Sequence, residues 1–147
     1  MEIEIKNRFN RSILLCGEYK SIKDCLERNT GADLTSAYLR GAYLTSANLT
    51  GANLTGANLR GAYLRGADLT SAYYNGEKLT KEPIQITGLK YFVFITSEQI
   101  KIGCELHKSG EWKKFTDKEI LAMDGKKALK WWKIHKRLIL GIYNANR

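Results

Sequence analysis

The chain has 147 residues, 44% of them hydrophobic and 27% charged, and its 24 Lys and Arg against 15 Asp and Glu give a formal net charge of +9. This length fits one domain with a small appendage and excludes two large catalytic lobes, while the composition excludes a disordered chain. The positive excess favours an anionic partner if it is concentrated on one face.

Three cysteines, Cys16, Cys25 and Cys104, are too few for a disulfide framework and cannot all pair within one chain. We therefore expect reduced thiols and a cytoplasmic location. The N-terminus lacks a basic segment followed by an apolar one, and the longest apolar runs, such as residues 138–142, are far too short to cross a bilayer. The sequence therefore predicts neither export nor a membrane partner.

The N-terminal segment is expected to cap the part of the chain that follows it. Apolar residues predict short strands at residues 3–6 and 12–15. Ser21 and Asp24 form a variant of the capping box, which predicts a short helix over residues 21–29. This helix is placed to cover the open end of the next segment.

The next segment repeats a five-residue unit nine times. Residues 32–76 are ADLTS, AYLRG, AYLTS, ANLTG, ANLTG, ANLRG, AYLRG, ADLTS and AYYNG, with alanine first in every unit and leucine third in eight. A period of five matches neither a helix nor a strand, so the backbone has to turn regularly to keep both residue types on one side. The leucines predicted to form the core are Leu34, Leu39, Leu44, Leu49, Leu54, Leu59, Leu64 and Leu69.

Units of the form A-(D/N)-L-x-x resemble those of the pentapeptide-repeat family. The resemblance implies a mainly β fold, a right-handed quadrilateral β-helix with one unit per side, four units per coil, and the alanine and leucine side chains pointing inward. The nine units then make about 2.25 coils, in which residues twenty apart stack at the strand spacing of about 4.8 Å. The β-helix is expected to end at Gly76, because Glu77 would bring a carboxylate to an inward alanine position.

Residues 77–147 are predicted to form a small basic α+β module with a β-hairpin and two helices. The hairpin is expected over residues 89–96 and 99–107, which contain many aromatic and β-branched residues. A capping box predicts a helix over residues 116–123, and an amphipathic pattern predicts another over residues 125–143. The predicted apolar face of the last helix comprises Ala128, Trp131, Trp132, His135, Leu138, Ile139 and Ile142.

The whole layout, with segments 1–31, 32–76 and 77–147, resembles short pentapeptide-repeat proteins that are frequent in phage and prophage genomes. The resemblance implies no established activity for the last segment. Some relatives in the family mimic DNA with long, strongly acidic solenoids and inhibit topoisomerases. The repeats of this chain are few and hold three arginines against two aspartates, a net charge of +1. We therefore do not expect DNA mimicry.

The first candidate binding surface is on the repeats. Stacking at twenty residues places Arg60 over Arg40 and Tyr63 over Tyr43, with Arg65 in the same upper coil. Aromatic rings beside guanidinium groups suit nucleobases and phosphates. The alternative is that the tyrosines cover a β-surface or form an oligomer contact.

The second candidate surface is on the last predicted helix. Lys126, Lys130, Lys133 and Arg137 recur at helical spacing and form one basic stripe. A stripe of this kind fits a phosphate-bearing ligand or an acidic protein. The alternative is the ordinary solvated face of an amphipathic helix.

No catalytic residue, metal site or cofactor is expected. Cys104 and His107 are three residues apart, which on a strand points their side chains to opposite faces, and too few other ligands remain for a zinc site. The hydrophobic neighbours of Cys104 predict a packed thiol. A Cys/His hydrolase also needs a third, orienting residue, and none is identifiable.

These observations predict a non-enzymatic binding protein that inhibits or sequesters an anionic target, either an acidic protein surface or a nucleotide signal. The resemblance extends this hypothesis to a phage-encoded protein directed against a host defence. Two alternatives stay open: a nucleic-acid-binding module that uses the basic C-terminal helix, and a structural scaffold for assembly. We also expect the chain to form a homo-oligomer.

Overall fold

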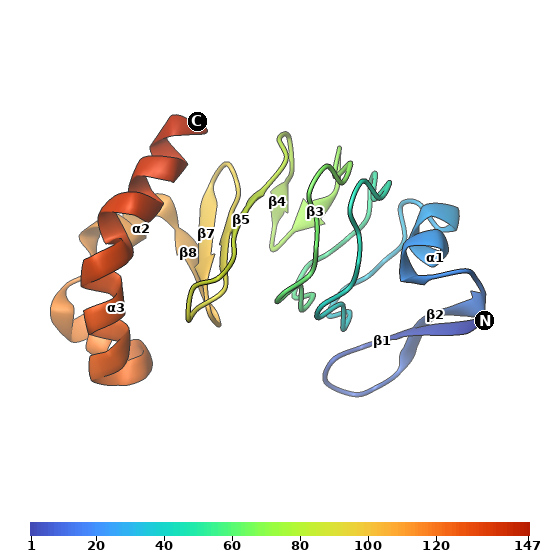
Figure 1. Ribbon diagram of the computed structural model, residues 1–147, viewed down its shortest axis with the longest axis horizontal. Helices are drawn as coiled ribbons and strands as arrows, with labels where there is room; N and C mark the ends of the chain where they lie inside the picture. The colour runs from blue at the N-terminus through green and yellow to red at the C-terminus, as the bar shows by residue number, and fades with distance from the viewer. The chain divides into compact units, whose positions relative to one another are not determined.

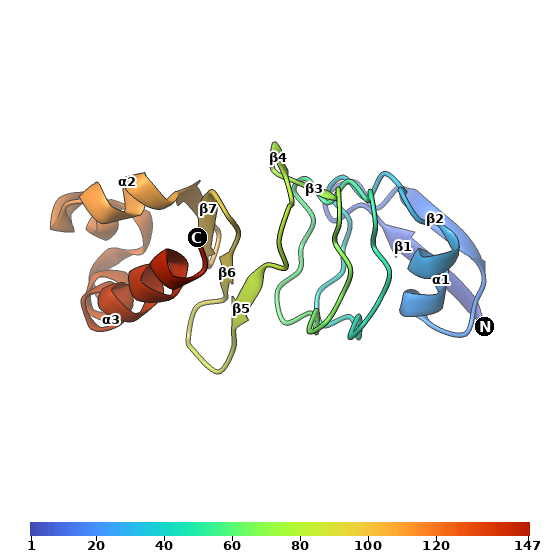
Figure 2. The ribbon, with the colours of Figure 1, turned by 90° about the horizontal axis from the view of Figure 1, so that it is seen from above.

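The fold is described from a computed structural model of residues 1–147, shown from two directions in Figures 1 and 2. The chain divides into two units, Met1–Glu82 and Pro83–Arg147. The β-strands belong to three separate small sheets, and the rest of the β structure consists of isolated bridges. None of the helices combines the length and the apolar character that crossing a bilayer requires.

The first unit begins with a hairpin of β1 (Glu2–Lys6) and β2 (Ile13–Glu18), followed by α1 (Ile22–Arg28). The side chains of β1 alternate, so that Ile3 and Ile5 are buried. The backbone N–H of Tyr38 donates to the carbonyl of Lys6 over 2.8 Å. The hairpin therefore continues the hydrogen bonding of the first repeat coil.

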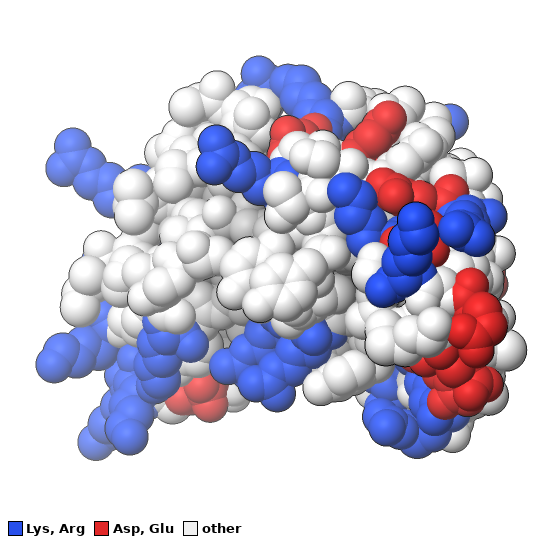
Figure 3. Space-filling view, turned by 45° about the vertical axis from the view of Figure 1, so that its right-hand side comes forward, with Lys and Arg blue, Asp and Glu red and all other residues white.

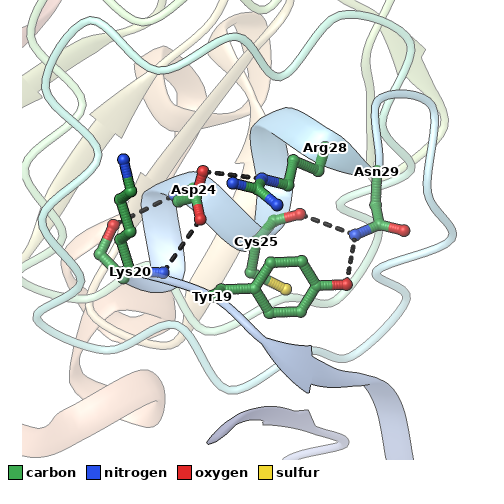
Figure 4. A network of polar contacts seen from close by, with 7 residues as sticks. Tyr19, Lys20, Asp24, Cys25, Arg28 and Asn29 are labelled. Carbon is green, nitrogen blue, oxygen red and sulfur yellow. Dashed lines mark hydrogen bonds and ion pairs between the residues drawn. The ribbon is translucent and has the colours of Figure 1, made fainter. Parts of the chain in front are cut away.

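Helix α1 is held by a compact polar network (Figure 4). Ser21 is the N-cap, and its hydroxyl accepts a hydrogen bond from the Asp24 N–H. Asp24 accepts from the Lys20 N–H and from Arg28 Nε, each over 2.9 Å. These contacts, led by the Lys20 N–H, lower the pKa of the Asp24 carboxyl. The helix buries Cys25 completely, and burial raises the pKa of that thiol.

The repeats form a β-helix-like structure in which residues twenty apart pair in parallel. The N–H of Leu34 donates to the carbonyl of Asn53 over 2.8 Å, and the N–H of Asn53 donates to Ala32 over 3.0 Å. The eight predicted core leucines are all buried, with exposed fractions of 5% or less. The parallel bridges join Asp33 to Asn53, Tyr38 to Asn58, Tyr43 to Tyr63, Asn48 to Asp68, and Asn53 to Tyr73.

The β-helix was expected to end at Gly76 because the carboxylate of Glu77 would be costly to bury. That reason was wrong, because Glu77 is buried. Glu77 lies in the alanine position of a tenth unit and is only 5% exposed, and the unit also buries Leu79. No buried side-chain nitrogen or oxygen lacks a hydrogen-bond partner, so the carboxylate is accommodated rather than excluded. The strands β3 (Tyr73–Tyr74) and β4 (Glu77–Lys78) pair across this junction, and the first unit extends to Glu82.

Acid should weaken the repeats through two aspartates. A hydrogen bond from the hydroxyl of the threonine two residues later, and then one from its N–H, lower the pKa of Asp33 and of Asp68. A carboxyl group whose pKa is lower in the folded state than in the unfolded state stabilises the fold at pH values above its unfolded-state pKa. This contribution is lost as the pH falls through the folded-state pKa. Asn48 makes the same bonds to Thr50 without ionising. The variant Asp33→Asn/Asp68→Asn should therefore lose less thermal stability between about pH 5 and about pH 2 than the unmodified chain, and equal losses would refute this.

The second unit contains an antiparallel sheet in the order β5-β6-β7-β8. The predicted hairpin is present, but its second strand is divided at Gly103, where φ is +59°. The sheet also gains a strand before the hairpin. Its strands are β5 (Ile84–Ile86), β6 (Val93–Ile95), β7 (Gln99–Ile102) and β8 (Glu105–Lys108).

Two helices, α2 (Ser109–Lys114) and α3 (Asp117–Ala145), complete the second unit. The short α2 was not predicted. In α3, the expected capping box between Thr116 and Glu119 is present. Non-helical φ/ψ values at Asp124 and Gly125 interrupt α3 at the boundary between the two helices predicted from the sequence. The core residues of this unit include Val93, Ile95, Ile100, Trp112, Ile120, Trp131, Trp132, Ile139 and Tyr143.

One residue of the predicted apolar face of α3 is exposed. Leu138 is 52% exposed, whereas Ile139 is fully buried. Successive helical residues differ by about 100° around the axis, and the buried side is centred on Trp132, Ile139 and Tyr143, so Leu138 falls outside it.

Candidate functional site

Two tyrosines form an exposed stacked pair on the repeats. The ring centroids of Tyr43 and Tyr63 are 4.9 Å apart, and the ring planes differ by 1°. The backbone fixes this arrangement, because the N–H of Leu44 donates to the carbonyl of Tyr63 over 2.9 Å. The spacing is that of neighbouring strands. The side chains remain open to solvent, with 75% of Tyr43 and 53% of Tyr63 exposed.

Arginines lie at the corners on both sides of this tyrosine pair. On one side, the N–H of Gly41 donates to the Arg60 carbonyl over 3.0 Å, which stacks the corner of Arg60 on that of Arg40. On the other side, the N–H of Ser46 donates to the Arg65 carbonyl over 2.9 Å. All three arginines are exposed. The tyrosine–arginine face is defined here as Arg40, Tyr43, Arg60, Tyr63 and Arg65.

A lysine from α1 joins one corner of this face. The ammonium of Lys23 donates to the carbonyl of Thr45 over 3.0 Å, at the corner that Arg65 overlies. Glu27 lies 3.8 Å from the same ammonium, and Glu82 accepts from the Gly66 N–H over 2.8 Å. This corner is therefore mixed in charge. Sequence reasoning missed Lys23 because only the cap packing brings it to the repeats.

The basic stripe of α3 is exposed as its helical spacing implies. Lys126, Lys130, Lys133 and Arg137 are all exposed. Lys133 forms an ion pair with Asp117 over 2.7 Å, so the stripe is not purely basic. In the face drawn in Figure 3, basic side chains lie among uncharged and acidic ones.

The predicted packed thiol at Cys104 was wrong, because Cys104 is exposed. It follows Gly103 in the tight turn between β7 and β8, which turns the residue out of the core. His107 instead lies among aromatic rings, with its centroid 5.3 Å from that of Trp112, and its Nε2 is 3.1 Å from a Glu105 oxygen. No group of three or more His, Cys, Asp and Glu is placed to hold a metal ion.

The comparisons with known proteins identify the repeats. Residues 32–70 match the family described as pentapeptide repeats, in eight copies. No curated protein and no solved structure matches the chain. The match covers the segment in which leucines are buried every five residues and bridges recur every twenty. Residues 32–70 are therefore pentapeptide repeats.

Proposed function

We propose that the chain is a non-enzymatic binding protein that sequesters an anionic nucleotide on its tyrosine–arginine face. The observation that carries the proposal is an exposed, stacked tyrosine pair with arginines at both adjacent corners. An exposed aromatic ring offers a stacking surface to a nucleobase, and a guanidinium offers paired donors to a phosphate. The backbone ladder stacks the tyrosine rings before a ligand arrives, which reduces the entropy lost on binding.

The proposal also specifies the geometry of the repeats. We take the repeats to be a right-handed quadrilateral solenoid of about 2.25 coils over residues 32–76, and the twenty-residue bridges support this geometry. In that geometry Tyr43 and Tyr63 occupy one flat side, and the arginines occupy the two edges of that side. A phage-encoded inhibitor of a cytoplasmic nucleotide signal would need only this surface and no catalytic group.

The proposal predicts that two tyrosines carry nucleotide binding. The double variant Tyr43→Ser/Tyr63→Ser should bind its best nucleotide about 5-fold to 150-fold more weakly, because stacking contributes about 1 to 3 kcal/mol per base. Calorimetric titration of the full chain with purine and pyrimidine mononucleotides and cyclic dinucleotides measures the change. The matched control is Tyr38→Ser/Tyr73→Ser, since these tyrosines are 45% and 46% exposed but are not part of the pair.

Equal affinities of the unmodified chain and the Tyr43→Ser/Tyr63→Ser variant would exclude the face as a nucleotide site. If the same variant instead changed a homo-oligomer into a monomer on size exclusion, the tyrosines would be an assembly contact. Capture of an acidic protein, lost in Arg40→Glu/Arg60→Glu, would replace the nucleotide by a protein target.

A second candidate is nucleic-acid binding by the basic stripe of α3, which the exposure of its four side chains favours. It requires a steep fall of affinity with salt, because each neutralised phosphate releases counterions. Binding of a nucleotide to the tyrosine–arginine face neutralises fewer phosphates, so its affinity should fall less steeply with salt. Titration with single-stranded oligonucleotides at two salt concentrations therefore separates the two candidates.

A further inference from the structure

The second unit contains a small aromatic hollow that the proposed function does not use. Its volume is about 50 Å³, which gives room for about four water-sized groups. All three tryptophans of the chain, Trp112, Trp131 and Trp132, line it together with Tyr91. The rings of Tyr91 and Trp131 meet edge to face, with centroids 5.0 Å apart and planes at 79°.

The rings around the hollow are fixed before any ligand binds. The indole N–H of Trp112 donates to the carbonyl of Ile100 over 2.7 Å, and its ring centroid is 5.1 Å from that of Trp132. The hydroxyl of Tyr91 donates to Asp124 Oδ2 over 2.8 Å. This hydrogen bond raises the pKa of the Tyr91 hydroxyl.

The charge at the hollow is opposite to that of the unit around it. Residues 83–147 hold 13 Lys and Arg against 6 Asp and Glu, an excess of seven positive charges. The charged residues that line the hollow are Glu105 and Asp124, both acidic. Lys90 and Lys136 lie over the rings of Tyr91 and Trp132, at 5.0 Å and 5.8 Å from the centroids, but neither lines the hollow.

We propose that this hollow binds a trimethylammonium group. The faces of aromatic rings attract cations, and a cluster of rings binds quaternary ammonium groups especially well because such cations carry no tightly held water. A nitrogen with three methyl groups has four heavy atoms, which matches the room available. The carboxylates of Asp124 and Glu105 add attraction that a neutral ligand of the same shape does not receive.

Titration of the full chain with choline, followed by tryptophan fluorescence, tests the proposal. All three tryptophans line the hollow, so occupancy should change the emission in a saturable way. The neutral comparison is 3,3-dimethyl-1-butanol, which has the shape of choline without its charge. Choline should bind about tenfold more tightly or better. Sodium chloride at equal ionic strength provides the baseline.

Two variants separate the site from general charge effects. Asp124→Asn should weaken choline binding several-fold while keeping a side chain that can still hydrogen-bond near the helix interruption. Asp117→Asn removes an acid of the same helix that does not line the hollow and should leave choline binding unchanged. The variant Tyr43→Ser/Tyr63→Ser should also bind choline normally, so failure of the nucleotide proposal would not affect this one.

A second set of titrations identifies which kind of molecule supplies the trimethylammonium group. Peptides with trimethyllysine and with unmodified lysine are compared with choline, and tighter binding of the methylated peptide would indicate a protein side chain rather than a free metabolite. Equal affinity for choline and 3,3-dimethyl-1-butanol would overturn the proposal and leave a purely apolar hollow. Absence of saturable change with either cation would also overturn it.

Discussion

Replacing Leu54 by alanine is expected to lower the free energy of unfolding of the repeats by about 2 to 5 kcal/mol. Leu54 is 1% exposed, and its N–H donates to the carbonyl of Tyr73 over 2.7 Å, so it sits within the paired coils. Truncation leaves a cavity in a narrow interior lined by other leucines and alanines. A rigid backbone ladder cannot collapse into that cavity, which places the cost toward the upper part of the range.

Urea unfolding followed by far-ultraviolet circular dichroism measures this loss. The matched control is Thr45→Ala, an exposed position on the same repeats, which should change the stability by about 0.5 kcal/mol or less. A cost below about 1 kcal/mol for Leu54→Ala would mean that the leucines do not form a packed interior.

The second large effect is expected in the other unit, where Trp112→Ala should cost about 3 to 5 kcal/mol. Trp112 is 3% exposed, and its ring contacts Phe115 and Trp132 at centroid distances of 5.3 Å and 5.1 Å. The substitution also removes the hydrogen bond to the Ile100 carbonyl. Domains are stable by about 5 to 15 kcal/mol, so the variant should lose a large share of its stability.

The conservative variant Trp112→Phe separates packing from hydrogen bonding. It keeps most of the ring and loses only the indole N–H, so its cost should be smaller than that of Trp112→Ala and near the about 0.5 to 1.5 kcal/mol of one intramolecular hydrogen bond. Urea unfolding followed by the fluorescence of Trp131 and Trp132 measures both variants. Unfolding midpoints equal to that of the unmodified chain would show that Trp112 is not a core residue.

The five-residue repeat predicted the buried core of residues 32–76. A strict five-residue period with alanine and leucine at fixed positions leaves few backbone paths that bury both, and the eight leucines are buried accordingly. Caps were also predictable, because Ser21 and Thr116 act through bonds to residues three positions away. Two separate helices were predicted over residues 116–123 and 125–143, and α3 is interrupted between them at Asp124 and Gly125, where Gly125 adopts a φ of +74°.

Features that depend on distant partners were not predictable. Glu77 was judged too costly to bury because its partner is not evident from neighbouring residues. The helix α2 and the strand β5 have only six and three residues, too few to show a period. The contribution of Lys23 to the tyrosine–arginine face and the gathering of three tryptophans around one hollow both arise from packing between elements.

The candidate tyrosine–arginine face was partly predictable for the same reason as the repeats. The twenty-residue period places Tyr63 over Tyr43 in any coil of four units, and the rings are indeed stacked. The pattern did not predict how exposed the rings are or that Glu27 and Glu82 lie near one corner. Because these acids lie near Arg65, only the corner of Arg40 and Arg60 is strongly basic.

The most direct test of the proposed recognition surface is a nuclear magnetic resonance titration of the full chain with the panel of nucleotides. Our account predicts that amide signals of residues 40–45 and 60–65 shift together and saturate, while those of residues 126–137 remain in place. Shifts confined to residues 126–137, or an absence of shifts with every nucleotide, would contradict it.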